Sequence, residues 1–294
     1  MAQGKALTRV AVPRFEAHRS GRRLLENAFW YVVLCAIASI TVVPFLWVLL
    51  TSLKGPRDAV YSIPPQFIPH DLTFANYVRV WTLLPMARFF INSVVVALAT
   101  VSLNLLFTSL AAYPFAKMTF PGRDLIFYLL LATFVVPPQL TFIPSYILAV
   151  KVFKYYDTLF ALIFPSLATV FNIFLLRQAF KTVPNDLIDA ARMDGASELR
   201  IWWQVVMPII RPSLATAAIF TFVNSWNDFF WPSLMLPTLQ HKTLPVGLVA
   251  LQGAFASDLR GVAAGVVMTI IPILIVFVLL QRQFVRGLTG AVKG

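Results

Sequence analysis

The sequence predicts an all-α integral membrane protein with six transmembrane helices, and three observations support this fold class. Hydrophobic residues make up 59% of the 294 residues and charged residues only 12%, whereas a soluble domain has about 25% charged residues. The mean hydropathy is +0.78. Several apolar runs reach the roughly 20 residues that a helix needs to cross a bilayer. No segment alternates in the manner of a barrel strand, so helices remain as the way to satisfy backbone groups in lipid.

The apolar runs place the six spans at about 28–53, 89–113, 125–149, 158–177, 212–236 and 261–281. Within them, only Asp228 in the fifth span and Arg177 at the edge of the fourth are charged. The transmembrane domain is therefore expected over 28–284, between tails at 1–27 and 285–294. The first run is too long for the apolar part of a signal peptide, which predicts an uncleaved first helix.

The net charge of +12 is explained by membrane topology and does not indicate a nucleic-acid partner. If the N-terminus is cytoplasmic, 16 of the 24 Lys and Arg residues fall in cytoplasmic segments. These segments are 1–27, 113–124, 177–211 and 282–294. The other eight cations fall in the outer segments 54–88, 149–157 and 237–260. Cytoplasmic loops are typically richer in Lys and Arg, so both tails are predicted to be cytoplasmic.

Several kinds of chemistry have no basis in the sequence. No phosphate-binding loop of the G-x-x-x-x-G-K-[ST] type is present, so the chain is not expected to bind ATP itself. His18, His70 and His241 lack metal-ligand spacing, and no catalytic set of carboxylate and histidine is evident. We therefore expect no metal, no cofactor and no catalytic residue in this chain. Proton-coupled transport is disfavoured, because it usually needs several acidic or histidine side chains inside the bundle.

Two of the predicted spans carry unusual residues. Pro137 and Pro138 lack amide donors and are expected to break or kink the third span. The fifth span is the most polar. Its residues at i, i+3, i+4 and i+7, which share one helical face, are Asn224, Asn227, Asp228 and Trp231. Such a face can bind sugar hydroxyls and stack on a sugar ring, or it can form hydrogen bonds to a partner helix.

The long connection at about 178–211 predicts two short helices with marked ends. Pro184 suits the first helical position, and Gly195 can adopt the left-handed conformation that ends a helix. Ser197 is expected to cap a second helix that runs to Pro208. The first helix is amphipathic, and its apolar side consists of Leu187, Ile188, Ala190 and Ala191. It fits either a helix lying on the membrane surface or an element that docks into another protein.

The spacing in this connection favours docking. Asp189-Ala190-Ala191, three residues, Gly195, nine residues and then Val205-Val206-Met207-Pro208 resembles the signature loop of ABC importer permeases. The family pattern is Glu-Ala-Ala, three residues, Gly, nine residues, and Ile, any residue, Leu-Pro. Asp, Val and Met replace Glu, Ile and Leu here, and each replacement keeps the chemical type. The resemblance implies that the residues in contact with a partner ATPase are Asp189, Ala190, Ala191, Gly195 and Pro208.

Further motifs are similar to the carbohydrate-uptake branch of these permeases, and in particular to the second maltose-type permease. They are Pro137-Pro138-Gln139, Phe120-Pro121-Gly122-Arg123 and Asn224-Ser-Trp-Asn-Asp-Phe-Phe-Trp-Pro232. The resemblance covers roughly residues 25–290. It implies the type I importer (MetI-like) permease fold in a bacterial or archaeal cell membrane.

The same resemblance implies a transport subunit, not an enzyme, that forms half of the path for a sugar or oligosaccharide. The expected partners are a second related permease, two cytoplasmic ATPases that bind ATP and Mg, an external solute-binding protein, and membrane lipids.

Two alternatives remain from the sequence. The same machinery could carry a glycerol-phosphate-type or polyol solute, although no Lys or Arg lies within the second to sixth charge-free runs. A stand-alone secondary transporter is the other alternative. In the last outer segment, Gly247 and Gly253 are expected to give a loop that could contact the solute-binding protein.

Overall fold

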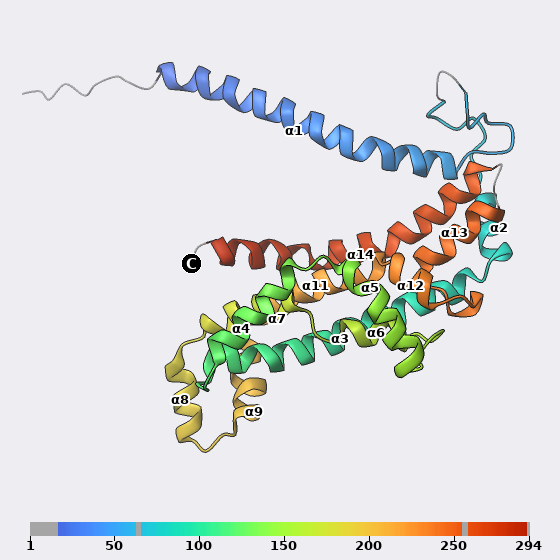
Figure 1. The fold of residues 1–294 in the computed structure, drawn as a ribbon. Coiled ribbons are helices and arrows are strands. Elements are labelled where there is room, and N and C mark those ends of the chain that lie inside the picture. The colour runs from blue at the N-terminus through green and yellow to red at the C-terminus, as the bar shows by residue number, and fades with distance from the viewer. Residues whose placement is uncertain (1–16, 63–65, 255–257, 293–294) are drawn as a thin grey trace, which may run out of the picture.

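The computed structural model describes residues 17–62, 66–254 and 258–292, and these form an elongated helical bundle (Figure 1). Three helices in these ranges are long and apolar enough to cross a membrane. They are α1 (Ala17–Ser52), α3 (Met86–Lys117) and α14 (Leu259–Val292). Most of the predicted tail 1–27 and the end of the tail 285–294 lie outside the described residues.

The other candidate spans are bent pairs of helical segments. The first joins α4 (Arg123–Ala132) and η1 (Thr133–Val135) to α5 (Pro138–Ile147) and η2 (Leu148–Val152), with a bend of 97°. The second joins α6 (Phe160–Ile163) and η3 (Phe164–Ser166) to α7 (Val170–Lys181), with a bend of 45°. The third joins α9 (Glu198–Arg200), η4 (Ile201–Val206) and α10 (Met207–Ile209) to α11 (Arg211–Asn227), with a bend of 85°. Counting each pair as one span gives up to six, and the all-α prediction is confirmed.

The breaks show where the predicted spans were right and wrong. The break between η1 and α5 falls at Pro137, as its missing amide donor predicts. The predicted fifth span over 212–236 is not one continuous helix. Helix α11 ends at Asn227, Asp228 is extended, and the short helix α12 (Phe230–Met235) follows. The 17 residues of α11 measure only about 26 Å, less than the roughly 30 Å of a hydrocarbon core.

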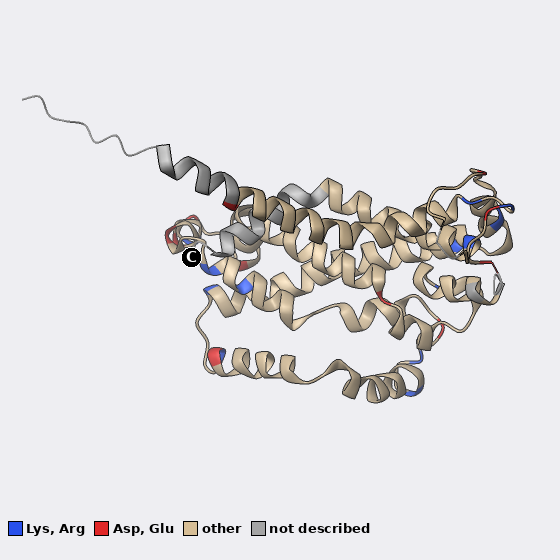
Figure 2. Cartoon of the chain, turned by 90° about the horizontal axis from the view of Figure 1, so that it is seen from above, with Lys and Arg blue, Asp and Glu red and all other residues tan. Residues whose placement is uncertain are grey.

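Short helices occupy the connections at both ends of the bundle. One end carries α2 (Ala75–Leu83), η5 (Leu239–His241) and α13 (Leu244–Ala254). The opposite end carries α8 (Asn185–Met193), and α1 begins and α14 ends toward this side (Figure 1). We call these the α13 end and the α8 end. Charged residues gather at both ends, and the length between them is nearly free of charge (Figure 2). This distribution fits a bundle that spans a membrane.

Three clusters of buried side chains hold the described helices together. The cluster at the α8 end joins α3, α7, α8, η4 and α11 around Phe180, Ile201 and Val206. A second cluster at the α13 end surrounds Phe89 and Trp226. The third packs α6 and α12 against α3. By contrast, no residue in the most hydrophobic stretch of α1 is buried within the chain. Helix α1 contacts mainly α14.

The connection that was predicted to be a loop at Gly247 and Gly253 is helical in this part, and Gly247 lies inside α13, where it serves close packing. A Cβ atom at Gly247 would come within 2.2 Å of the Phe89 ring, and Phe89 is fully buried. A Cβ atom at Gly253 would meet nothing within 4 Å. The two glycines therefore form a matched pair, one in a tight contact and one on an open helix surface.

We expect Gly247→Ala to lower stability by about 1–3 kcal/mol, because the added methyl group forces the Phe89 ring out of its place. Gly253→Ala should be neutral or slightly stabilising, because Ala favours the helix by up to about 1 kcal/mol. The unfolding midpoint of each purified variant in detergent tests this. Equal midpoints for the two variants would mean that α13 does not pack on α3 as described.

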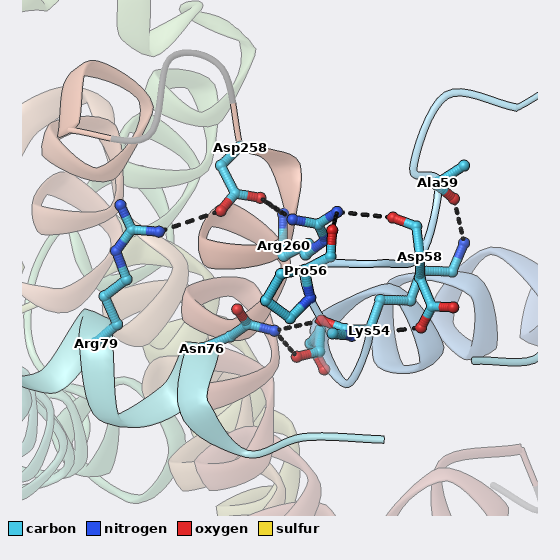
Figure 3. Close-up of polar contacts among 10 residues, drawn as sticks. Lys54, Pro56, Asp58, Ala59, Asn76, Arg79, Asp258 and Arg260 are labelled. Carbon is cyan, nitrogen blue, oxygen red and sulfur yellow. Dashed lines mark hydrogen bonds and ion pairs between the residues drawn. The ribbon is translucent and has the colours of Figure 1, made fainter. Parts of the chain in front are cut away.

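A polar cluster at the α13 end holds the segment before α2 in place (Figure 3). Its members are Lys54, Asp58, Arg79, Asp258 and Arg260, with the amide of Asn76. Buried Lys54 donates to the carbonyls of Ala59 and Gln66. The guanidinium of Arg260 donates to the Asp58 carbonyl at 2.7 Å. Its partner Asp258 also pairs with Arg79 at 3.2 Å. The cluster thus ties the segment after α1 to α2 and to the start of α14.

One carboxylate of this cluster organises the loop backbone. Asp58 accepts hydrogen bonds from the backbone N–H groups of Gly55, His70 and Asp71. Burial opposes ionisation of Asp58, but these N–H donors and the His70 side chain together lower its pKa. The loop is therefore folded around an ionised carboxylate.

Candidate functional site

Helix α8 begins one residue later than its sequence predicts and ends, as predicted, just before Gly195. Pro184 is the N-cap residue, so the first helical position belongs to Asn185. Gly195 has a φ angle of +77°. Its N–H bonds to the Arg192 carbonyl at 3.0 Å, and the N–H of Ala196 bonds to the Ala191 carbonyl at 3.0 Å. This pair of bonds is a Schellman motif, which explains why a glycine ends the helix.

The apolar side predicted for α8 is divided between two environments. Ile188 is buried and belongs to the cluster at the α8 end, and Ala191 packs against that cluster. Leu187 is 46% exposed, Met193 is 88% exposed, and Ala190 is also exposed. The inner side therefore attaches α8 to its own chain. We call the exposed residues Leu187, Ala190 and Met193 the α8 outer face.

A polar network joins α8 to the next helix and to α3. Arg192 pairs with Asp189 at 3.0 Å and with Glu198 at 2.7 Å. The second carboxylate oxygen of Glu198 accepts a hydrogen bond from the hydroxyl of buried Tyr113 at 2.8 Å. Asp189, which the signature places at the partner contact, thus has a basic partner within its own chain. Sequence reasoning missed Tyr113, Arg192 and Glu198 as a unit, because Tyr113 is far from the loop in sequence.

This network predicts a pH dependence. The hydrogen bond from Arg192, followed by that from Tyr113, lowers the pKa of Glu198 below its usual value of 4.5 despite partial burial. A group with a lowered folded-state pKa stabilises the protein above its unfolded pKa, and this stabilisation is lost as the pH falls through the lowered value. We therefore expect wild type to exceed Glu198→Gln in stability most at neutral pH. The difference between their unfolding midpoints should shrink as the pH falls below about 4.5. A constant difference would contradict an ionised Glu198 in this network.

Pro208, the last residue of the predicted contact set, lies in α10, just before the 85° bend into α11. Pro208 is exposed, while Ile210 at the bend is buried. Upstream, Ser197 occupies the N-cap position of α9, as predicted, but its side chain forms no capping hydrogen bond. Trp202 is buried in the cluster at the α8 end, and neighbouring Trp203 is 60% exposed. The structure therefore brings α8, α9 and the bend together as one unit that leads into α11.

Two cations form contacts between helices next to this unit, and neither was identified from the sequence. Lys117, at the end of α3, donates to the Val183 carbonyl at 2.5 Å and to Asn185 Oδ1 at 2.7 Å. Buried Arg177 of α7 donates to the Phe115 carbonyl, and its guanidinium lies 3.8 Å from the centre of the Phe127 ring. Lys117 therefore fixes the start of α8 to the end of α3, and Arg177 joins α7 to α3 and α4.

The predicted polar face of the fifth span is wrong as a single helical face. Asn224 and Asn227 are both exposed in α11, but the helix ends at Asn227. The Asp228 carboxylate lies near the backbone N–H groups of Phe230 and Trp231. Trp231 lies in α12, is 9% exposed, and donates its indole N–H to the Ala161 carbonyl at 2.9 Å. Trp231 therefore packs inside the bundle. Among the four predicted residues, Asn224 and Asn227 are the ones that are exposed.

Two amide side chains inside the bundle form hydrogen bonds between helices, one of them beside a helix break. Asn104 of α3 donates to the Ser166 carbonyl at 2.7 Å, beside the break between η3 and α7. Asn172 donates to Asn104 and to Thr221, joining α3, α7 and α11. Polar side chains that pair between helices are a usual way to fix membrane bundles. These amides therefore serve packing, unlike the exposed pair in α11.

Comparison with known proteins agrees with this geometry. The profile of the family described as "Binding-protein-dependent transport system inner membrane component" matches residues 104–290. The arabinooligosaccharides transport system permease protein of Halalkalibacterium halodurans is 36% identical over 88% of this chain and 93% of its own. The diacetylchitobiose uptake system permease protein of Streptomyces coelicolor is 34% identical over 91% of this chain and 88% of its own.

A solved structure shares the fold. It is a bacterial ABC transporter involved in the import of the acidic polysaccharide alginate, and one of its chains is 25% identical, with a TM-score of 0.79. The match covers 92% of this chain and all of the other. The importer-permease fold is thereby confirmed, and the chain is a transport subunit, not an enzyme. This chain belongs to the family of binding-protein-dependent transport system inner membrane components.

Proposed function

We propose that this chain forms half of the translocation pathway of an ATP-driven importer for a sugar or oligosaccharide. Its partners are a second related permease, two ATPase subunits that bind ATP and Mg, and an external solute-binding protein. The observation that carries the coupling role is the uncovered α8 outer face on a helix whose inner side and ends are fixed to the bundle. A rigidly held helix with an exposed apolar face is suited to docking in a groove of another protein.

The orientation of the chain in the membrane follows from the proposed contact between α8 and an ATPase. The α8 end is cytoplasmic, and both tails lie on that side, because ATP hydrolysis occurs in the cytoplasm. The bias of Lys and Arg toward the segments 1–27, 113–124, 177–211 and 282–294 supports this orientation. Closure of the ATPases on ATP draws the α8 helices of the two permeases together. The bend into α11 passes that movement to the helix that carries the exposed asparagines.

The solute class is supported by the relatives and by the charge of the spans. The relatives include permease proteins for arabinooligosaccharides and diacetylchitobiose and a lactose transport permease of Rhizobium radiobacter. The segments 89–116, 125–150, 158–176, 212–241 and 261–281 contain no Lys or Arg. Exposed amides such as Asn224 and Asn227 can hydrogen-bond neutral hydroxyl groups. A neutral oligosaccharide is therefore the solute that this half of the path fits best.

A glycerol phosphate is the second candidate, for one specific reason. The sn-glycerol-3-phosphate transport system permease protein of Escherichia coli O157:H7 is 29% identical over 92% of this chain and all of its own. A phosphate would need cations along the path, and the partner permease would have to supply them.

Uptake by the complete transporter decides between these solutes. The permease pair, the ATPases and the binding protein are reconstituted in proteoliposomes with radiolabelled oligosaccharides and sn-glycerol-3-phosphate. We expect ATP-dependent uptake of an oligosaccharide and none of the phosphate. The reverse pattern would assign the phosphate, and uptake driven by an ion gradient without ATPases would reject the importer assignment.

The asparagines of α11 give a narrower test of the path. We expect Asn227→Leu to reduce uptake about ten-fold, the effect of losing one or two hydrogen bonds to the solute. Asn227→Gln should retain more activity, because it keeps the amide. Co-purification with the partner permease should be unchanged in both variants. A loss of co-purification with Asn227→Leu would instead assign this residue to the contact between permeases.

A further inference from the structure

Two candidate membrane spans end on a lysine, and the two lysines line one groove at the α8 end. The span Met86–Lys117 and the bent pair that finishes with Val170–Lys181 are the spans concerned. The groove has a volume of about 480 Å³ and is open to the surface. Its lining residues come from the ends of α3 and α7 and the start of α8: Ala116, Lys117, Lys181, Thr182, Val183, Pro184 and Asn185.

The positive charge of this groove is not neutralised by its own walls. Lys117 donates to the Val183 carbonyl and to Asn185 Oδ1, which are both neutral acceptors. Lys181 is exposed. None of the described lining residues is acidic. The nearby carboxylate of Asp124 does not line the groove; it is paired with Arg123 at 3.2 Å and Arg177 at 3.4 Å, and it interacts electrostatically with Lys181 from outside the groove. The groove therefore presents two cations to whatever fills it.

The position of the groove indicates which anion it meets. Apolar helices end at both lysines, so the groove lies at the level where acyl chains give way to lipid headgroups. Basic pockets between membrane helices on this side bind the headgroups of anionic lipids. The α8 outer face, in contrast, begins at Leu187 and is made of apolar residues. Charge and depth thus favour a lipid in the groove and a protein partner on the outer face.

We propose that this groove binds the phosphate of an anionic phospholipid, held between Lys117 and Lys181. The bound headgroup lies against residues 182–185, the segment that joins α7 to α8. The lipid is thereby a structural partner of the connection that leads into the candidate coupling helix. This assignment concerns lipid binding alone and can be tested without measuring transport.

The test is native mass spectrometry of the complete transporter, titrated with phosphatidylglycerol and with phosphatidylcholine. The variants are Lys181→Gln, Lys181→Arg and the control Lys151→Gln, which removes an exposed lysine from η2. We expect Lys181→Gln to weaken phosphatidylglycerol binding about five-fold, since one lysine near an anionic surface contributes about 1 kcal/mol. Lys181→Arg and Lys151→Gln should bind as wild type does, and phosphatidylcholine binding should not change.

Three results would overturn the proposal. An equal loss of phosphatidylglycerol binding with Lys151→Gln would mean that the effect comes from general surface charge. Displacement of the lipid by millimolar glycerol phosphate or inorganic phosphate would assign the groove to a soluble phosphate. Binding of phosphatidylglycerol only after the ATPase subunits are removed would mean that an acidic segment of that partner occupies the groove.

Discussion

Gly195→Asp is expected to abolish coupled uptake while the permease still folds and inserts. Gly195 is exposed, and a Cβ atom there would meet nothing within 4 Å. Asp tolerates the left-handed backbone conformation better than most residues, so the chain itself accepts the change. The new carboxylate, however, lies at the end of the α8 outer face. If that face enters a dry groove on the ATPase, burying an unpaired charge costs several kcal/mol.

The matched control is Gly195→Asn, which has nearly the same shape and the same tolerance of a positive φ angle but no charge. Uptake and solute-stimulated ATP hydrolysis are measured in proteoliposomes, and assembly is measured by co-purification. We expect uptake to fall more than ten-fold for Asp and much less for Asn. Normal transport by the Asp variant would remove α8 from the ATPase contact and would make the match to the signature loop accidental.

Glu198→Ala is expected to give the second large effect, because it removes a residue that joins the end of α8 to α3. The buried Tyr113 hydroxyl loses its acceptor, and the Arg192 guanidinium loses one of its two carboxylate partners while it keeps Asp189. Leaving a buried donor without a partner costs about 1–3 kcal/mol. We therefore expect a lower unfolding midpoint. We also expect more ATP hydrolysed per solute imported, because α8 is then held less firmly on the bundle.

Arg200→Ala is the control for this experiment. It removes an exposed pair between Arg200 and Gln204 in the same connection, and such surface changes usually stay within about 0.5 kcal/mol. Adding Tyr113→Phe to Glu198→Ala should restore part of the lost stability, since the unpaired hydroxyl is then gone. Strictly additive losses would mean that the two side chains do not interact.

The sequence by itself determined the features that depend on composition and local geometry. Long charge-free runs predicted a helical membrane protein with up to six spans, because lipid demands apolar residues over a fixed length. Pro137 located the break before α5, because proline cannot donate a backbone hydrogen bond. Gly195 located the end of α8, because few other residues adopt a φ angle of +77°. The signature spacing identified the family, and the profile match confirms it.

Only the tertiary structure decided which surfaces remain free. Helical periodicity put Leu187 and Ile188 on one apolar side, but packing buried Ile188 and left Leu187 exposed. Periodicity likewise joined Trp231 to Asn227, although α11 ends between them and Ala161 takes the indole N–H. Helical periodicity holds only within a continuous helix, and it does not specify which side chains pack against each face. The partner of each face depends on side chains distant in sequence, and their positions exist only once the helices have packed.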